Sequence, residues 1–168
     1  KKMSETLPDT PIVAAMVYYP EIDGIISDPK TVVVSSLGSS KELISQLKMF
    51  RKIKSIGLLY SSSISPAASS IMADLKSQGV DVADLPVAKQ EDIASAFESV
   101  KGRIQAMVVL PDNLTQNPDA VRFIVTQSVS GDIMPVSFNE NMVSSGMFFS
   151  AYFPTDAIGR KSAQVVKE

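Results

Sequence analysis

The chain contains neither cysteine nor histidine. Without cysteine there is no disulfide framework and no thiol nucleophile, and without histidine the usual base of a hydrolytic triad is missing. Both absences together also remove the ligands of a conventional zinc site. Enzyme chemistry would have to depend on carboxylates, as in a magnesium site, so we expect a protein that is not an enzyme and carries no cofactor.

Glycine is sparse, and the eight glycines are not spaced as in a G-x-G-x-x-G or a Walker A loop. Dinucleotide-binding and P-loop functions are therefore excluded. The sequence also lacks a large basic cluster: Arg51, Lys52 and Lys54 lie close together, but they follow a predicted helix, whose last turn favours cations. With a net charge of −2, we expect neither nucleic acid nor an anionic membrane surface as a partner.

No apolar run reaches the roughly 18 residues that a membrane-spanning helix needs. The opening segment, Lys1 to Pro8, has no apolar stretch of the kind found in secretion signals. If the protein is exported, its targeting segment has been removed or lies outside this sequence. The 168 residues are 45% hydrophobic and 20% charged, which is typical of a globular protein with a sizeable core.

Short β-rich segments alternate with helical ones along the chain. The segment 41–53 carries apolar Leu43, Ile44 and Leu47 at helical spacing, while Ser40, Ser65 and Asn117 are expected to cap helices. We expect strands at residues 11–19, 31–34, 55–60, 80–85, 104–110, 133–138 and 147–152, and helices at residues 41–53, 65–79, 90–100, 117–130 and 155 onward. This alternation predicts an α/β fold with a mostly parallel sheet sandwiched by helices.

Polar loops follow three of the predicted strands. In an open parallel sheet, ligands bind beyond the carboxyl ends of the strands, so the candidate ligand-binding residues are Ser61, Ser62, Ser63, Asp112, Asn113, Asn139 and Glu140. Serine hydroxyls and helix N-termini suit a carboxylate, and Asp112 or Glu140 could accept from an ammonium group. The set therefore favours a small zwitterion such as an amino acid, although serine and asparagine also cap helices and stabilise turns.

Large apolar residues are abundant near the end of the predicted sheet. Met142, Met147, Phe148 and Phe149 are interpreted as packing residues and not as a binding surface. No histidine, cysteine or clustered acidic pair accompanies them, and we expect no metal site.

Several short motifs are similar to those of a known family. They are Ile56 to Ser63, Leu110-Pro111-Asp112-Asn113, Pro135-Val136-Ser137, Val143 to Met147 and Ile158 to Ala163. In this order and spacing they resemble the tryptophan-binding-like group of ABC-transporter substrate-binding proteins. The segment from Thr10 to Pro20 resembles the late part of that family's first lobe, so the likeness spans roughly residues 11–168.

The resemblance implies a type I periplasmic-binding fold, in which two α/β lobes trap a ligand between them. Residues 1–38 would be a remnant of the first lobe and its crossover, and residues 39–168 the second ligand-binding lobe. The family's role implies an amino-acid-like solute bound in the interlobe cleft, delivery to an ABC permease, and a place in the periplasm or as an extracytoplasmic lipoprotein. Because most of the first lobe is missing, a swapped homodimer is one way of completing the fold.

Two other functions remain open at this stage. The same fold serves as the ligand-sensing effector domain of signalling or regulatory proteins, and fold alone does not separate the two roles. An enzyme that uses carboxylates and magnesium is the third interpretation, and it would require magnesium-dependent turnover.

Overall fold

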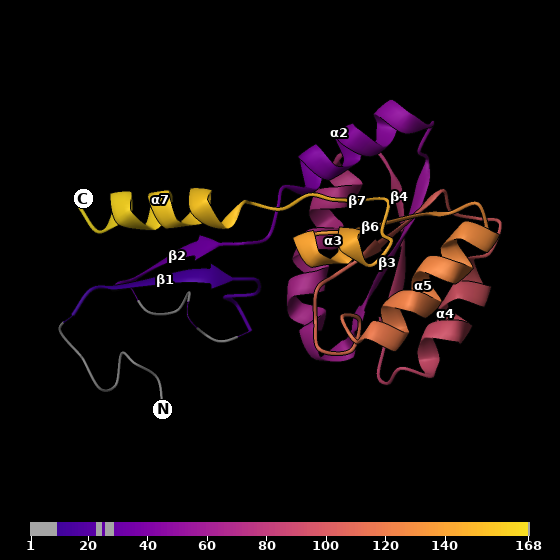
Figure 1. Ribbon diagram of the computed structural model, residues 1–168, viewed down its shortest axis with the longest axis horizontal. Helices are drawn as coiled ribbons and strands as arrows, with labels where there is room; N and C mark the ends of the chain where they lie inside the picture. The colour runs from indigo at the N-terminus through magenta and orange to yellow at the C-terminus, as the bar shows by residue number, and fades with distance from the viewer. Residues whose placement is uncertain (1–9, 23–24, 26–28, 168) are drawn as a thin grey trace. The chain divides into compact units, whose positions relative to one another are not determined.

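The computed structural model describes residues 10–22, 25 and 29–167 (Figure 1). The predicted absence of a secretion signal concerns residues 1–8, which lie outside this range. The chain divides into two compact units. Unit 1 combines Lys1–Leu37 with Phe153–Glu168, and unit 2 is the continuous stretch Gly38–Tyr152.

The described residues of unit 1 form two parallel strands and one helix. Strand β1 (Ile12–Val17) pairs with β2 (Thr31–Ser35), and the register shifts between Ala15 and Val17, where Met16 has a φ of 61°. Helix α7 (Thr155–Val165) packs against both strands and buries Ile158. The sequence interpretation placed this helix in the second lobe, whereas in the structure it groups with the N-terminal strands. Its partners are distant in sequence, so helical periodicity does not reveal them.

Unit 2 contains a five-stranded parallel sheet in the order β4-β3-β5-β6-β7. Its strands are β3 (Ser55–Ser61), β4 (Asp81–Val87), β5 (Ala106–Val109), β6 (Met134–Ser137) and β7 (Phe149–Ser150). The connections between neighbouring strands contain helices, as parallel pairing requires. The predicted α/β sandwich is therefore confirmed.

Five α-helices belong to unit 2: α2 (Ser40–Phe50), α3 (Ser65–Ser77), α4 (Asp92–Val100), α5 (Pro118–Ser130) and α6 (Glu140–Ser144). Figure 1 shows α2 and α3 on one side of the sheet and α4 and α5 on the other. Both faces are thus covered, which explains why β3 and β5 are almost wholly buried instead of alternating between buried and exposed residues.

The core on the α4 and α5 side joins strand and helix residues into one apolar cluster. Leu59 and Val109 from the strands pack with Phe97 of α4 and Ile124 of α5 in this cluster. Gly57 lies on the same face, where an added Cβ would come within 2.9 Å of a Leu85 methyl and 3.0 Å of the Met107 sulfur. Strand β3 therefore lies too close to its neighbours at Gly57 to accept a larger side chain there without repacking.

The helix ends differ from the sequence expectations in three places. Ser39, and not Ser40, caps α2 by accepting a hydrogen bond from the Glu42 amide at 3.3 Å. Ser65 lies inside α3, because a 3-10 turn over Ser62–Ile64 precedes that helix and is capped by Ser61. Helix α6 was expected to be a loop; five residues are too few to show helical periodicity.

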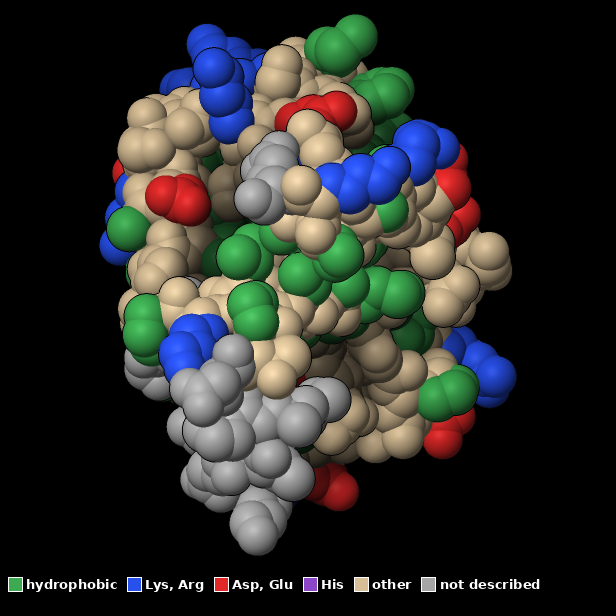
Figure 2. Space-filling view, turned by 90° about the vertical axis from the view of Figure 1, so that its left-hand side faces the viewer, with side chains coloured by type: hydrophobic (Ala, Val, Ile, Leu, Met, Phe, Trp, Pro, Cys, Tyr) green, Lys and Arg blue, Asp and Glu red, His purple; other side chains and the backbone are tan. Residues whose placement is uncertain are grey.

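Charges of both signs are interspersed over the face shown in Figure 2. No helix in the described part of the chain is long and apolar enough to cross a membrane.

Candidate functional site

The candidate site lies at the carboxyl edge of the unit 2 sheet. Because β3, β5 and β6 are parallel, the loops that follow them emerge at this edge. Three of the predicted residues, Ser61, Asp112 and Asn139, each begin or organise one of these loops. The structure connects the first two loops directly, through Asp112.

The Asp112 carboxylate accepts three backbone hydrogen bonds. One oxygen accepts from the amide of Ser61 at 2.7 Å, and the other from the amides of Leu114 and Thr115 at 2.8 Å each. The Thr115 hydroxyl completes the turn by donating to the Leu110 carbonyl at 2.6 Å. Asp112 therefore ties the end of β3 to the loop after β5. The sequence assigned it a direct contact with the ligand, whereas most of its hydrogen-bonding capacity is used within the protein.

The serine segment has one buried and two exposed members. Ser61 is 9% exposed, and its hydroxyl lies 2.9 Å from that of Ser63 and accepts from the Ser63 amide at 3.4 Å. Ser62 and Ser63 are exposed. Ser61 acts as a cap, as the alternative interpretation of these serines holds, while its two neighbours are exposed and the Ser63 hydroxyl contacts that of Ser61.

The third loop is the start of α6. Asn139 caps this helix, its side-chain oxygen accepting from the Asn141 amide at 2.9 Å. Glu140, in the first turn, is exposed, and a side-chain hydrogen bond with it raises the pKa of Tyr152. The pairing of Tyr152 with a glutamate twelve positions away has no signal in the sequence.

A hollow of about 210 Å³ opens between α5 and α6 beside Asn139. Its polar lining includes Gln116 and Ser145, and its apolar lining includes Val121 and Met142. The Gln116 amide donates to the Asp112 carbonyl at 3.0 Å, so this wall continues the Asp112 loop. The carboxyl edge thus has a small mixed cavity as well as exposed hydrogen-bonding groups.

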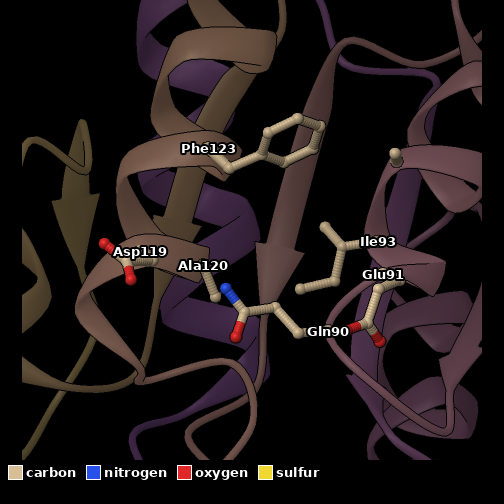
Figure 3. A pocket seen from close by; sticks show the side chains of 7 residues that line it. Gln90, Glu91, Ile93, Asp119, Ala120 and Phe123 are labelled. Carbon is tan, nitrogen blue, oxygen red and sulfur yellow. The ribbon is translucent and has the colours of Figure 1, made fainter.

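A larger hollow of about 330 Å³ lies between α4 and α5 and contains none of the predicted residues. Figure 3 shows Glu91 and Asp119 on opposite sides, with Ile93 and Phe123 between them. Both acids stand at or next to a helix N-terminus, where the helix dipole stabilises negative charge. This position explains them without a ligand, so we place the site at the three loops despite the greater volume of this hollow.

Tyr60 is the next-to-last residue of β3 and immediately precedes the serines 61–63. It is 3% exposed, and its hydroxyl donates to Asp84 at 2.8 Å. Burial, and then the hydrogen bond to Asp84, raise the pKa of Tyr60 to about 12. Its buried ring and satisfied hydroxyl make it a core residue that supports the loop above.

Metal ligands are not clustered in the described residues, where no group of three or more acidic side chains could hold an ion. The hydrogen-bonding groups at the carboxyl edge are instead hydroxyls, amides and two carboxylates, Asp112, which is bonded within the protein, and Glu140, which is exposed. This combination can bind a small polar molecule by hydrogen bonds and charge.

Comparison with known families resolves the assignment. The model of the ABC transporter substrate binding protein family matches residues 10–168. The chain belongs to this family. The match covers both units, including the segments that carry the motifs identified in the sequence.

Solved structures agree on the fold. An ABC domain from Streptococcus pneumonia, in complex with L-Trp, is 24% identical with a TM-score of 0.68, and the match covers 95% of this chain and 58% of that one. A ligand-free, open substrate binding protein with adhesive properties from Clostridium difficile is 20% identical with a TM-score of 0.72, covering 95% and 57%. The chain thus spans a little over half the length of these relatives.

A third structure, a conserved domain protein from Vibrio cholerae, is 20% identical with a TM-score of 0.70, covering 94% of this chain and 55% of that one. No curated protein matches the chain. At these identities the structures establish the periplasmic-binding-protein-like fold. Proteins of this family work outside the cytoplasm, in the periplasm or an equivalent compartment.

Proposed function

We propose that the carboxyl edge of the unit 2 sheet binds a small zwitterionic solute resembling an amino acid. The observation that carries this proposal is the Asp112 carboxylate, which fixes two loops so that exposed donors stand at one sheet edge. A family match over residues 10–168 supports solute binding as the purpose of that edge.

Each predicted residue then has a distinct part. Ser62, Ser63 and Asn113 donate hydrogen bonds to the solute carboxylate, and Glu140 accepts from its ammonium group. The side chains of Ser62 and Asn113 are exposed and make no hydrogen bond within the described part of the chain, so they are available to a ligand. Ser61, Asp112 and Asn139 act mainly by holding the loops in place.

The ligand at the carboxyl edge is expected to be recognised through its charges. A zwitterion requires donors on one side and an acceptor on the other, which is the arrangement of the serine segment and Glu140. An L-Trp ligand is known for the Streptococcus relative, and this supports an amino acid as the first class to test. We propose no enzymatic step, since binding and release suffice for this role.

Delivery to an ABC permease is the second part of the proposal. Closure around the solute would create the form that the permease recognises. We also propose an extracytoplasmic location with a lipid anchor, in keeping with the family. If the solute-loaded chain stimulates ATP hydrolysis by a reconstituted permease, delivery is supported. A solute that binds without any such stimulation would favour the sensing role instead.

Thermal unfolding against a panel of amino acids tests the binding site. A solute at a hundred times its Kd stabilises a protein by about 2.7 kcal/mol, which is roughly 5–10 °C for a chain of this size. We expect Glu140→Gln to reduce this shift strongly. The matched control is Glu91→Gln, the same change at the larger hollow, and it should leave the shift intact. A shift lost in Glu91→Gln and kept in Glu140→Gln would place the site between α4 and α5 and refute our assignment.

A further inference from the structure

Exposed aromatic side chains gather at one margin of unit 2. Phe50, the last residue of α2, is 61% exposed, and Phe148, which precedes β7, is 48% exposed. Their ring centroids lie 4.9 Å apart at an interplanar angle of 84°, and the ring of Phe149 lies 6.2 Å from that of Phe50. Sequence interpretation treated Phe148 and Phe149 as packing residues. The fold instead joins them to a distant phenylalanine in an exposed cluster.

Cationic residues flank Phe50 in the sequence. The segment 48–54 carries four Lys or Arg residues and no acid. Arg51 is paired with Asp132 at 3.0 Å, but Lys52 and Lys54 are exposed and form no ion pair with any described residue. A helix dipole explains a cation in the last turn of α2, such as Lys48, but its effect falls off within a turn. It does not account for Lys52 and Lys54.

We propose that this surface docks on an anionic lipid membrane. The lipid-facing patch consists of Met49, Phe50, Phe148, Lys48, Lys52 and Lys54. Exposed apolar groups beside lysines are characteristic of surfaces that lie at the headgroup boundary, with the rings inserted and the cations near lipid phosphates. Each cation near such a surface strengthens partitioning roughly fivefold.

The size of the patch favours lipid over a protein partner. Met49 is 80% exposed, so the three apolar side chains project outward, but a phenylalanine has only about 150–250 Å² to bury. Because Phe50 and Phe148 expose only 61% and 48% of their surface, the exposed area of the three side chains falls well short of the roughly 800 Å² per partner found in stable protein interfaces. A membrane needs no such area, because a few inserted side chains and several cations suffice for reversible binding.

The patch and the solute site occupy opposite edges of the same sheet. Phe50 precedes β3, and Arg51 donates to the backbone carbonyl of Asp132, which precedes β6. The candidate site loops follow these strands. Contact with lipid at the amino edge therefore leaves the solute loops of unit 2 facing away from the membrane. From the charges alone, the sequence predicted no membrane partner, and the exposed aromatic rings change that expectation. This proposal does not depend on the proposed solute.

Tryptophan fluorescence offers a direct test, because the chain contains no tryptophan. We expect Phe50→Trp and Phe148→Trp to show a blue shift with vesicles of equal parts phosphatidylglycerol and phosphatidylcholine. Vesicles of phosphatidylcholine alone should cause none. Val143→Trp is the matched control, since Val143 is 43% exposed on α6, at the carboxyl edge, and its emission should not change.

Vesicle flotation with charge variants completes the experiment. Lys52→Gln with Lys54→Gln should lower the partition coefficient about 25-fold, at roughly fivefold for each lysine. The control pair, Lys89→Gln with Arg122→Gln, removes the same charge from exposed positions outside the patch and should have a much smaller effect. Absence of binding to anionic vesicles would overturn the proposal. So would equal losses in both pairs, or binding to an acidic polypeptide but not to vesicles.

Discussion

Removing the Asp112 carboxylate should loosen the candidate site and destabilise unit 2. The side chain accepts hydrogen bonds from the amides of Ser61, Leu114 and Thr115 at 2.7–2.8 Å. A hydrogen bond to a charged group contributes about 1.5–3 kcal/mol. Water can reach this half-buried loop and replace part of that energy, so we expect Asp112→Ala to cost about 2–4 kcal/mol in free energy of unfolding.

Substitution by asparagine separates charge from geometry. In Asp112→Asn the amide oxygen can still accept from Leu114 and Thr115, but the NH2 group would face the Ser61 amide, and two donors cannot pair. We expect about half the loss of the alanine variant, roughly 1–2 kcal/mol. Asn113→Ala is the matched control, because Asn113 is the exposed neighbour in the same loop.

Urea unfolding measures the free energies, and hydrogen exchange identifies the amides. Protection should fall at Ser61, Leu114 and Thr115 in Asp112→Ala and remain unchanged in Asn113→Ala. Surface substitutions usually stay within about 0.5 kcal/mol. If Asp112→Ala is as mild as the control, or if the Ser61 amide keeps its protection, then Asp112 does not tie the loops together.

Two further predictions concern packing and titration. A Cβ on Gly38 would collide with the Ala151 carbonyl, whereas one on Gly159 would meet nothing within 4 Å. Gly38→Ala should therefore cost about 1–3 kcal/mol and Gly159→Ala should stabilise α7 by about 0.5–1 kcal/mol in thermal unfolding; similar values for both would contradict the packing. Because the pKa of Tyr60 is raised to about 12, stability is fully present below pH 10 and lost as pH rises toward 12. Tyr60→Phe should abolish this loss, and ultraviolet titration should show a tyrosine that titrates at about pH 12 and disappears in the variant.

Much of the fold could be predicted because it depends on local pattern. Buried parallel strands are continuous apolar runs, such as 55–60 and 104–110, and amphipathic helices follow them at regular intervals. Asn117, followed by Pro118, was correctly expected to cap α5. Helix α6 and the 3-10 turn after β3 were missed, since both are too short for periodicity to show.

The roles of the site residues depend on contacts that sequence does not record. A general rule of parallel sheets predicts where the three loops lie. The hydrogen bond from the Ser61 amide to Asp112 depends instead on the register of β3 and β5. Met142 and Met147 are buried, as expected, while Phe148 is exposed beside Phe50. Periodicity cannot distinguish the buried methionines from the exposed phenylalanine, because Phe148 precedes β7, the edge strand of the sheet.

The central claim is that a zwitterionic solute binds at the carboxyl edge of the unit 2 sheet, and amide chemical shifts test it most directly. With a solute identified from the amino-acid panel, the backbone amides of Ser62, Ser63, Asn113 and Glu140 should shift together as solute is added. The amides of Phe50 and Lys52, at the opposite edge, should stay unchanged. Shifts confined to Gln90 to Ala94 and to the start of α5, with the three loops silent, would contradict the account.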